Sequence, residues 1–371
     1  MEFSFKDQFR TFIETKSNGK NTVMYDEQGN PNIMVWFPKM TCGQLGLPTN
    51  VDKTHPAFII DTSGREVDGI WISKYLSAKG AGGKPVSYHG LRPWSNISRN
   101  DARKASMSLG KGWHLLTNLE FAAVALWAYA NGTNRVGLRG GAPYVSKATT
   151  RKRFENEYID REDKIATNVG LIYPAYNGIG DLDFSHDHTT DGIIDLNGNF
   201  RDICDGCYIG PGFEWVHYWG NPDTKELCNC FEENIYIDET VSIDNGKDGG
   251  GVGKYVDKIS YNKDTQRCGG GISPCKFLEV KNYPPQIANT SVEYRHLLEM
   301  ALLPTPKMVS DNTITGNAQF SPVDDNRMRP IARGGDSESN LAIDLFEYRF
   351  PDMAVTEYTF NYGFRTAYVE L

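Results

Sequence analysis

Four cysteines in the middle of the chain have the residue type and spacing of metal ligands. A Cys-x2-Cys pair is followed, after twenty residues, by a Cys-x-Cys pair (Cys204, Cys207, Cys228 and Cys230). Four thiolates can close the tetrahedral site of a structural zinc ion, which would brace a loop-rich segment without a core of its own. Two alternatives stay open: disulfides formed outside the cell, and plain buried thiols.

A second candidate metal site lies in the segment GDLDFSHDHTTDG. Its carboxylates are the hard oxygen ligands that calcium prefers. They belong to Asp181, Asp183, Asp187 and Asp191. The spacing is not that of an EF-hand loop, so a solvated acidic loop is the competing interpretation. No firm cofactor follows from the sequence, and structural zinc or calcium are the two candidates.

Residues 336–362 have the composition of a binding surface, because aromatic and charged side chains are interleaved there. The candidate ligand-binding residues are Asp336, Glu338, Asn340, Asp344, Phe346, Tyr348, Arg349, Phe350, Asp352, Glu357, Tyr358 and Phe360. The alternate spacing of Phe346, Tyr348 and Phe350 leaves a second interpretation open, in which these rings are part of the core.

Motifs for catalysis are scarce. The seven histidines include one close pair, His186 and His188. The sequence has no H-E-x-x-H, nucleophile elbow, phosphate loop or G-x-G-x-x-G. We therefore expect a protein that is not an enzyme.

Composition excludes several classes of partner. The chain has 371 residues, of which 39% are hydrophobic, so it can bury a sizeable core. The net charge of −8 argues against nonspecific binding of nucleic acid. No apolar run approaches the ~20 residues of a membrane span, and the first residues lack the layout of a signal peptide. We expect synthesis in a cytoplasm, no membrane insertion and no nucleic-acid partner.

The elements that must position these residues are mostly strands. Two β-rich runs around a turn predict a hairpin over Asn21–Lys39. A second strand pair is expected at Ala57–Asp61 and Gly69–Tyr75, and Tyr362–Leu371 is expected as a last strand beside the early ones.

Three helices are predicted from capping signals. Ser98 opens the first, the capping box Thr117-Asn118-Leu119-Glu120 opens the second, and the third is expected over Val292–Leu303. Few helices in a strand-rich chain indicate the α+β class, with mixed antiparallel sheets and long inserted loops.

Four segments, in order, carry a resemblance to one family. They are IWISKY (Ile70–Tyr75), the helix pair from Trp94 to Trp127 around GWHLLTNLEFAAVALW, DLNGNFRDI (Asp195–Ile203), and RPIARGG (Arg329–Gly335) followed after 27 residues by GFRTA (Gly363–Ala367). Together they resemble the formylglycine-generating-enzyme branch of the C-type-lectin fold, over roughly residues 57–371. The leucine-rich segment His296–Pro304 is similar to phage and prophage variants, among them variable proteins of diversity-generating retroelements.

The resemblance implies a domain organisation. Residues 1–56 form a lead-in and β-hairpin that would serve attachment or oligomerisation. Residues 57–371 form the C-type-lectin-like domain, with an insertion around 135–285.

The sequence departs from the family pattern in ways that bear on function. The oxidases of the family have a cysteine pair near the C-terminal end, and no cysteine lies between Arg329 and Leu371. The tryptophan after R-G-G is absent, and Arg201-Asp202-Ile203 stands where the family has W-E-W. The Glu, Met and Arg residues within 336–362 do not fit adenine-directed diversification, so we expect a fixed protein of this fold.

The resemblance implies a bacteriophage virion protein, a tail fibre or similar, that binds a host cell-surface receptor through residues 336–362. The receptor would be a protein or a glycan. The implied assembly is a homotrimer in contact with other virion proteins. The alternatives are a structural virion component, such as a head-fibre, decoration or tail-assembly protein, and an oxidase of the parent family.

Overall fold

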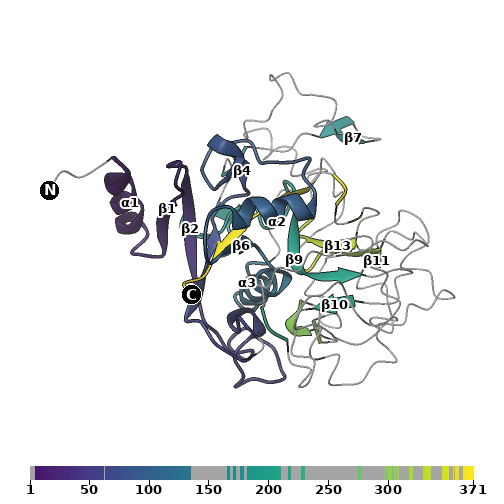
Figure 1. Cartoon of the computed structure of the whole chain (residues 1–371). Helices are drawn as coiled ribbons and strands as arrows, with labels where there is room; N and C mark the ends of the chain where they lie inside the picture. The colour runs from purple at the N-terminus through teal and green to yellow at the C-terminus, as the bar shows by residue number, and fades with distance from the viewer. Residues whose placement is uncertain are drawn as a thin grey trace.

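Figure 1 shows the fold of the chain as a computed structural model. The structure describes residues 5–134 without 62, and residues 176–178, 182–209, 227–229, 299–302, 329–335, 345–350, 356–358 and 362–371. It also describes residues 165–167, 170–172, 216–218, 275–276, 296, 305, 307–308, 317–320 and 354.

A five-stranded antiparallel sheet joins the two ends of the chain. Its strand order is β1 (Asn21–Tyr25), β2 (Pro31–Pro38), β3 (Gly69–Ser73), β16 (Thr366–Tyr368) and β6 (Trp113–Leu115). Ala367 pairs with Ile72 on one side and with His114 on the other. The prediction that the last strand lies beside the early ones is confirmed, and Figure 1 shows the C-terminus next to β2.

The predicted hairpin is also confirmed, as β1 and β2. Because β2 is hydrogen-bonded to β3, residues on both sides of the predicted boundary at residue 56 contribute to one sheet. The boundary itself stays a prediction.

The second sheet is mixed. Its strands are β9 (Arg201–Ile209), β10 (Val216–Tyr218), β11 (Cys275–Lys276), β12 (Asn317–Phe320), β13 (Arg329–Arg333), β14 (Tyr348–Phe350) and β15 (Tyr362–Phe364). β15 runs parallel to β9, and β12 runs parallel to β14. The predicted C-terminal strand is therefore two strands, β15 in this sheet and β16 in the first, with Arg365 between them. Two small pairs also lie among the described residues, β4 (Ala78–Lys79) with β5 (Pro85–Val86) and β7 (Ile165–Thr167) with β8 (Gly170–Ile172).

Three α-helices lie wholly within the described residues: α1 (Phe5–Lys16), α2 (Arg99–Met107) and α3 (Asn118–Ala130). The two predicted caps are confirmed. Ser98 accepts from the Asp101 N–H, and Thr117 and Glu120 form a reciprocal capping box. The helix predicted over residues 292–303 lies largely outside the described residues.

The main core lies between α3 and the inner face of the first sheet. Most residues of α3 are buried, and Val35, Phe37, Ile70 and Ile72 pack in the same cluster. This burial explains why a helix with apolar residues on nearly every side is stable here.

One strand prediction is wrong in its extent. Residues Pro56–Phe58 form a short 3-10 helix, and the rest of Ala57–Asp61 pairs only through an isolated antiparallel bridge between Ile59 and Glu66. His55 starts the 3-10 helix by accepting the Ala57 N–H through Nδ1 (3.2 Å), and Pro56 fits the first helical position.

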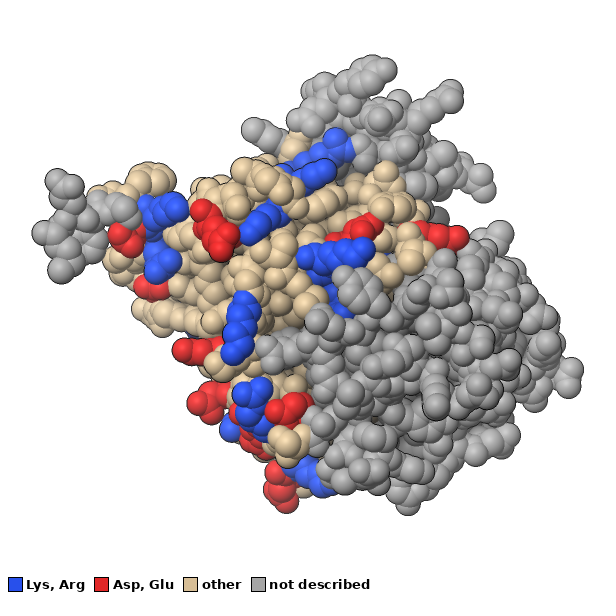
Figure 2. Space-filling view, viewed as in Figure 1, with Lys and Arg blue, Asp and Glu red and all other residues tan. Residues whose placement is uncertain are grey.

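The described part of the chain is thus a mixed α+β structure with few helices and largely antiparallel sheets. Within that part, no helix is long and apolar enough to cross a bilayer. Figure 2 shows charges of both signs scattered over the visible described surface, without a patch of one sign.

Candidate functional site

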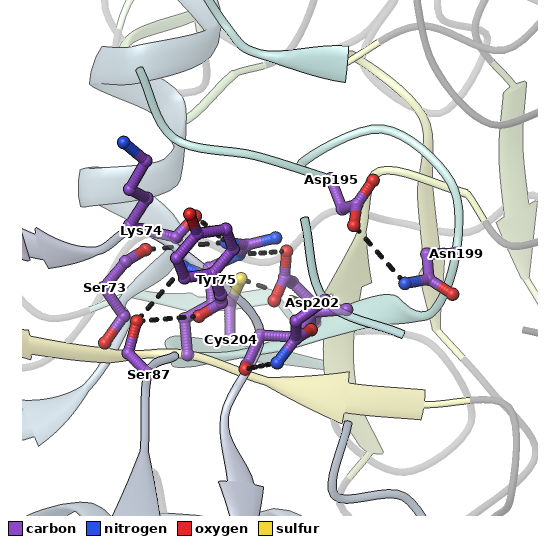
Figure 3. A network of polar contacts seen from close by, with 11 residues as sticks. Ser73, Lys74, Tyr75, Ser87, Asp195, Asn199, Asp202 and Cys204 are labelled. Atoms are coloured by element: carbon purple, nitrogen blue, oxygen red, sulfur yellow. Dashed lines mark hydrogen bonds and ion pairs between the residues drawn. The ribbon is translucent and has the colours of Figure 1, made fainter. Parts of the chain in front are cut away.

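Arg365 lies where the chain passes from the second sheet to the first, and its side chain is fully buried. Its Nε donates to Asp202 Oδ2 (3.0 Å), and its Nη1 donates to the carbonyl oxygens of Ser73 (3.5 Å) and Lys74 (3.2 Å). Ser73, Lys74 and Asp202 lie together in this network (Figure 3). One guanidinium therefore ties β3 to β9. Burial raises the pKa of Asp202 to about 6, although Arg365 opposes the shift.

Arg333 is a second buried anchor, at the end of β13. Its Nε donates to Asn118 Oδ1 (2.7 Å) at the start of α3, and its Nη2 donates to the Ala301 carbonyl (2.9 Å). Its guanidinium lies 5.1 Å from the centre of the Tyr348 ring. Arg333 thus holds β13, α3 and β14 together.

Gly334 brings the R-G-G segment against the loop before β9. Its φ of 79° is in the left-handed region, and a Cβ there would overlap the Leu196 carbonyl. The Gly198 N–H donates to the Gly334 carbonyl (2.6 Å). Glycine is required at this position both for its backbone conformation and for the close approach.

Arg201 and Asp202, at the start of β9, both make buried ion pairs. Arg201 Nη2 donates to Glu347 Oε1 (3.1 Å), and both side chains are buried. Asp202 binds Arg365, as described above. This part of β9 is therefore held by charge pairs rather than by tryptophan packing.

Sequence reasoning missed two further buried polar groups. Arg99 and Arg103 on α2 both pair with Asp205 on β9. Burial would raise the pKa of Asp205, but the two guanidinium groups outweigh it and lower the pKa. The four-residue spacing of the two arginines on a helix was the available signal.

The second missed group surrounds Glu120 at the start of α3. Its Oε1 lies 2.7 Å from His114 Nε2 and accepts from Asn229 Nδ2 (2.9 Å). Asn229 also donates to the Ala57 carbonyl (3.2 Å). Glu120 therefore joins three distant segments, and nothing in the sequence beyond the capping box indicated this.

The structure divides the predicted ligand-binding residues. Phe346 and Tyr348 are buried in the main cluster, at 0% and 8% exposure. They are core residues, which corrects their assignment to a ligand-facing surface and agrees with the alternative that the alternate spacing had left open. The reason is that Phe346, just before β14, packs edge-on against Tyr129 of α3 (ring centres 5.6 Å apart), and Tyr348 lies under the Arg333 guanidinium.

Tyr358 has the opposite environment, because 60% of it is exposed. Its hydroxyl donates to Asp101 Oδ2 (2.5 Å) at the start of α2, and this bond raises the pKa of the phenol. Glu357 closes the preceding turn, since its Oε2 accepts from the Ala354 N–H (2.7 Å). The exposed ring is therefore oriented by Asp101, next to a turn that Glu357 closes.

Two more of the predicted ligand-binding residues lie on β14. Arg349 is half-buried on β14, and Phe350 follows it in that strand. The remaining ones lie outside the described residues: Asp336, Glu338, Asn340, Asp344, Asp352 and Phe360.

The cysteines of the predicted zinc site have different states. Cys204 and Cys207 are buried on β9 and belong to no disulfide, and burial raises the pKa of Cys204 well above its usual range. Cys228 is disulfide-bonded, and a disulfide sulfur is not a thiolate ligand. Cys230 lies outside the described residues. The four-thiolate zinc site would require the disulfide of Cys228 to be reduced.

The predicted calcium ligands are partly used within their own loop. Asp187 accepts hydrogen bonds from the Ser185 hydroxyl (2.7 Å) and from the Thr189 N–H (3.0 Å). The side chains of Asp181 and Asp183 lie outside the described residues, so calcium binding stays a prediction. Among the residues that the structure describes, no group of three His, Cys, Asp or Glu side chains is placed to hold a metal ion.

Comparisons with models of known protein families and with curated proteins find no match for the chain.

Proposed function

We propose that this chain is a non-enzymatic receptor-binding protein of a phage virion, with a C-type-lectin-like domain that presents part of residues 336–362 to a host cell-surface ligand. The proposal has two parts, the fold and the binding surface, and each is supported by a different set of contacts.

The C-type-lectin-like fold is supported by the way in which the four family segments meet. Arg365 of G-F-R bonds to Ser73 and Lys74 of IWISKY and to Asp202 of DLNGNFRDI. Arg333 and Gly334 of R-G-G contact the helix pair at Asn118 and the loop at Leu196. Segments that resemble one family in order also interlock in space, as the conserved frame of a single fold would.

The binding surface is supported chiefly by Tyr358. Both ends of the segment are fixed by buried arginines, and within it Phe346 and Tyr348 anchor the chain in the core. Tyr358 is then left largely exposed, oriented by Asp101. A fixed, exposed tyrosine is a typical contact residue of protein interfaces, because it offers a large ring at a low cost in conformational entropy.

A binding experiment with two matched variants tests this role. Labelled protein would be mixed with a panel of bacterial cells, and Tyr358→Ala compared with Phe12→Ala, whose ring on α1 is 56% exposed. We expect Tyr358→Ala to lose adsorption while Phe12→Ala keeps it. Equal adsorption by both variants would count against this surface.

The alternative of a structural virion component is favoured by one observation. Phe5 and Phe12, seven residues apart on α1, are 82% and 56% exposed. Residues with this spacing share one face of a helix, and an exposed apolar face of that kind suits attachment or assembly. In that case Phe12→Ala, and not Tyr358→Ala, would impair incorporation into particles.

A further inference from the structure

The outer face of the five-stranded sheet carries a row of four aromatic residues, one from each of four adjacent strands. Trp36 on β2 pairs with Trp71 on β3, Trp71 pairs with Tyr368 on β16, and Tyr368 pairs with Trp113 on β6. Side chains alternate along a strand, so these rings face away from the core that the neighbouring residues Phe37 and Ile70 fill. We call these four residues the aromatic row.

The rings of the aromatic row are fixed in position. Trp36 and Trp71 form one tilted pair, with ring centres 5.0 Å apart, and Trp113 and Tyr368 form another at 5.4 Å. A glycine lies beneath one ring of each pair. A Cβ at Gly69 would overlap the Trp36 ring, and a Cβ at Gly112 would lie 2.9 Å from the Tyr368 ring. The rings therefore rest on the backbone and have little freedom to move.

The row remains accessible to a ligand, because all four residues are half-buried rather than buried. Within the described part of the chain, no hydrogen bond reaches the three indole N–H groups or the Tyr368 hydroxyl. None of these four polar atoms is among the buried atoms that lack a partner, so they face water. The row thus offers aromatic faces together with four unused hydrogen-bond donors.

The charged side chains that border the row at one end are paired with one another. Lys39, which follows β2 at the end of the row that carries Trp36, is paired with Glu66 (3.2 Å) and Asp68 (3.6 Å). Figure 2 shows a broad uncharged area in the region where Figure 1 draws β1, β2 and β6, with isolated charges at its borders. A neutral ligand fits such a surface better than an ionic one.

We propose that the aromatic row is a binding site for a neutral glycan, separate from residues 336–362. The apolar C–H faces of sugar rings can pack on the indole and phenol rings, and their hydroxyl and ring oxygens can accept from the unused N–H groups. A linear chain of linked sugars suits a row that crosses four strands.

A second copy of this chain fits the row less well. Indole N–H groups donate and cannot accept. A twofold-related copy would bring the three donor-only indoles against the same set of donors and leave them unsatisfied, at a cost in free energy. Sugar hydroxyls both donate and accept, so they do not have this defect.

The test uses the full chain labelled with ¹⁵N and follows the indole N–H signals by NMR. The probes are linear hexasaccharides of α-1,4-linked glucose, β-1,4-linked glucose and β-1,4-linked N-acetylglucosamine. We expect at least one of them to shift the signals of Trp36, Trp71 and Trp113 together, while Trp94 and Trp127 stay in place. Trp71→Ala should weaken this binding by about tenfold or more.

Two controls separate this site from stability and from the proposed receptor surface. Trp71→Phe keeps a ring but loses the N–H, so it should keep the fold and weaken binding less than alanine does. Tyr358→Ala should leave hexasaccharide binding unchanged, so this proposal and the receptor proposal can fail independently.

Three results would overturn the proposal. One is the absence of any shift of the three indole signals with all three probes at millimolar concentration. Another is unchanged affinity in Trp71→Ala protein with a native spectrum. The third is broadening of the row's signals with protein concentration alone, which would identify a second copy as the occupant.

Discussion

The guanidinium of Arg365 donates to the carboxylate of Asp202 across 3.0 Å, and both side chains are at most 1% exposed. The pair sits between the two sheets, and the same guanidinium bonds to the Ser73 and Lys74 carbonyls. A buried pair of this kind contributes little net free energy as a unit, but breaking it leaves an uncompensated charge. This asymmetry determines what substitutions here should do.

Arg365→Met should lower the free energy of unfolding by about 3 to 5 kcal/mol at neutral pH, because Asp202 would remain buried and ionised without its cation. Chemical denaturation at pH 7.5 measures this. The loss should shrink at pH 5, because Arg365 opposes the rise in the pKa of Asp202, and without it the folded variant gains more from protonation of Asp202 than the parent protein does.

The double variant with Asp202→Asn is the control for this prediction. It removes the charge, so it should recover much of the loss and abolish the difference between pH 7.5 and 5. If Arg365→Met alone is as stable as the parent protein at pH 7.5, the pair does not tie the sheets together.

Gly334→Ala should destabilise the protein by more than about 2 kcal/mol, because the new Cβ adds an overlap with the Leu196 carbonyl to the cost of a positive φ. Gly83→Ala is a matched control. Gly83 has a similar φ of 70° but has no atom near the position of a Cβ. Gly83→Ala should lower the free energy of unfolding by about 1 kcal/mol. Thermal unfolding of both variants compares the two effects, and equal losses would show that the close approach carries no cost.

The parts of the fold that the sequence predicted are those determined by local signals. Side-chain caps at Ser98 and Thr117 mark helix starts because they depend on residues three positions away. The hairpin at Asn21–Lys39 was predictable for the same reason. The strand predicted at Ala57–Asp61 is reduced to a single bridge at Ile59, because the His55 side chain and Pro56 favour a 3-10 turn before it.

The site was harder to predict, because its contacts join residues that are far apart in the sequence. The spacing of Phe346 and Tyr348 fits a strand, but spacing does not tell which face of that strand is covered. The aromatic row was not foreseen, because strand register alone brings Trp36, Trp113 and Tyr368 to one face.

Tyr348 and Tyr358 should respond in opposite ways to replacement by alanine. Tyr348→Ala should lower the unfolding free energy by about 3 kcal/mol, because it leaves a cavity in the core and removes the contact with Arg333. Tyr358→Ala should change stability by no more than about 0.5 kcal/mol, as expected of an exposed residue. Urea denaturation distinguishes them, and a large loss for Tyr358→Ala would mean that its ring supports the fold.

Acid should weaken the fold through two buried histidines. Burial lowers the pKa of His55 and of His186 from 6.5 to about 4. Between pH 6.5 and pH 4 the unfolded state binds a proton at each histidine and the folded state does not. The contribution of the two neutral histidines to the free energy of unfolding is therefore complete above pH 6.5 and is lost as the pH falls. The raised pKa of Asp202 acts in the opposite direction, which leaves a net loss of about 2 kcal/mol between pH 6.5 and 5.

Chemical denaturation across this pH range in His55→Gln protein tests the assignment. Glutamine can still donate to the Met300 carbonyl, as His55 Nε2 does at 2.8 Å, but it does not titrate. The variant should therefore show a shallower dependence of stability on pH than the parent protein. Parallel curves for the two proteins would rule out His55 as a source.

The free cysteines should be inert in the folded protein. Cys42, Cys204 and Cys207 are each 0% exposed, and burial raises the pKa of Cys42 to about 11. A thiol reagent attacks the thiolate, so neither access nor ionisation favours reaction at neutral pH. Labelling followed by mass spectrometry should leave these three thiols unmodified until denaturant is added. Rapid labelling of Cys204 or Cys207 in native protein would instead show that β9 opens.

If labelling became possible only after a chelator removed bound zinc, that result would support the thiolate site predicted from the sequence.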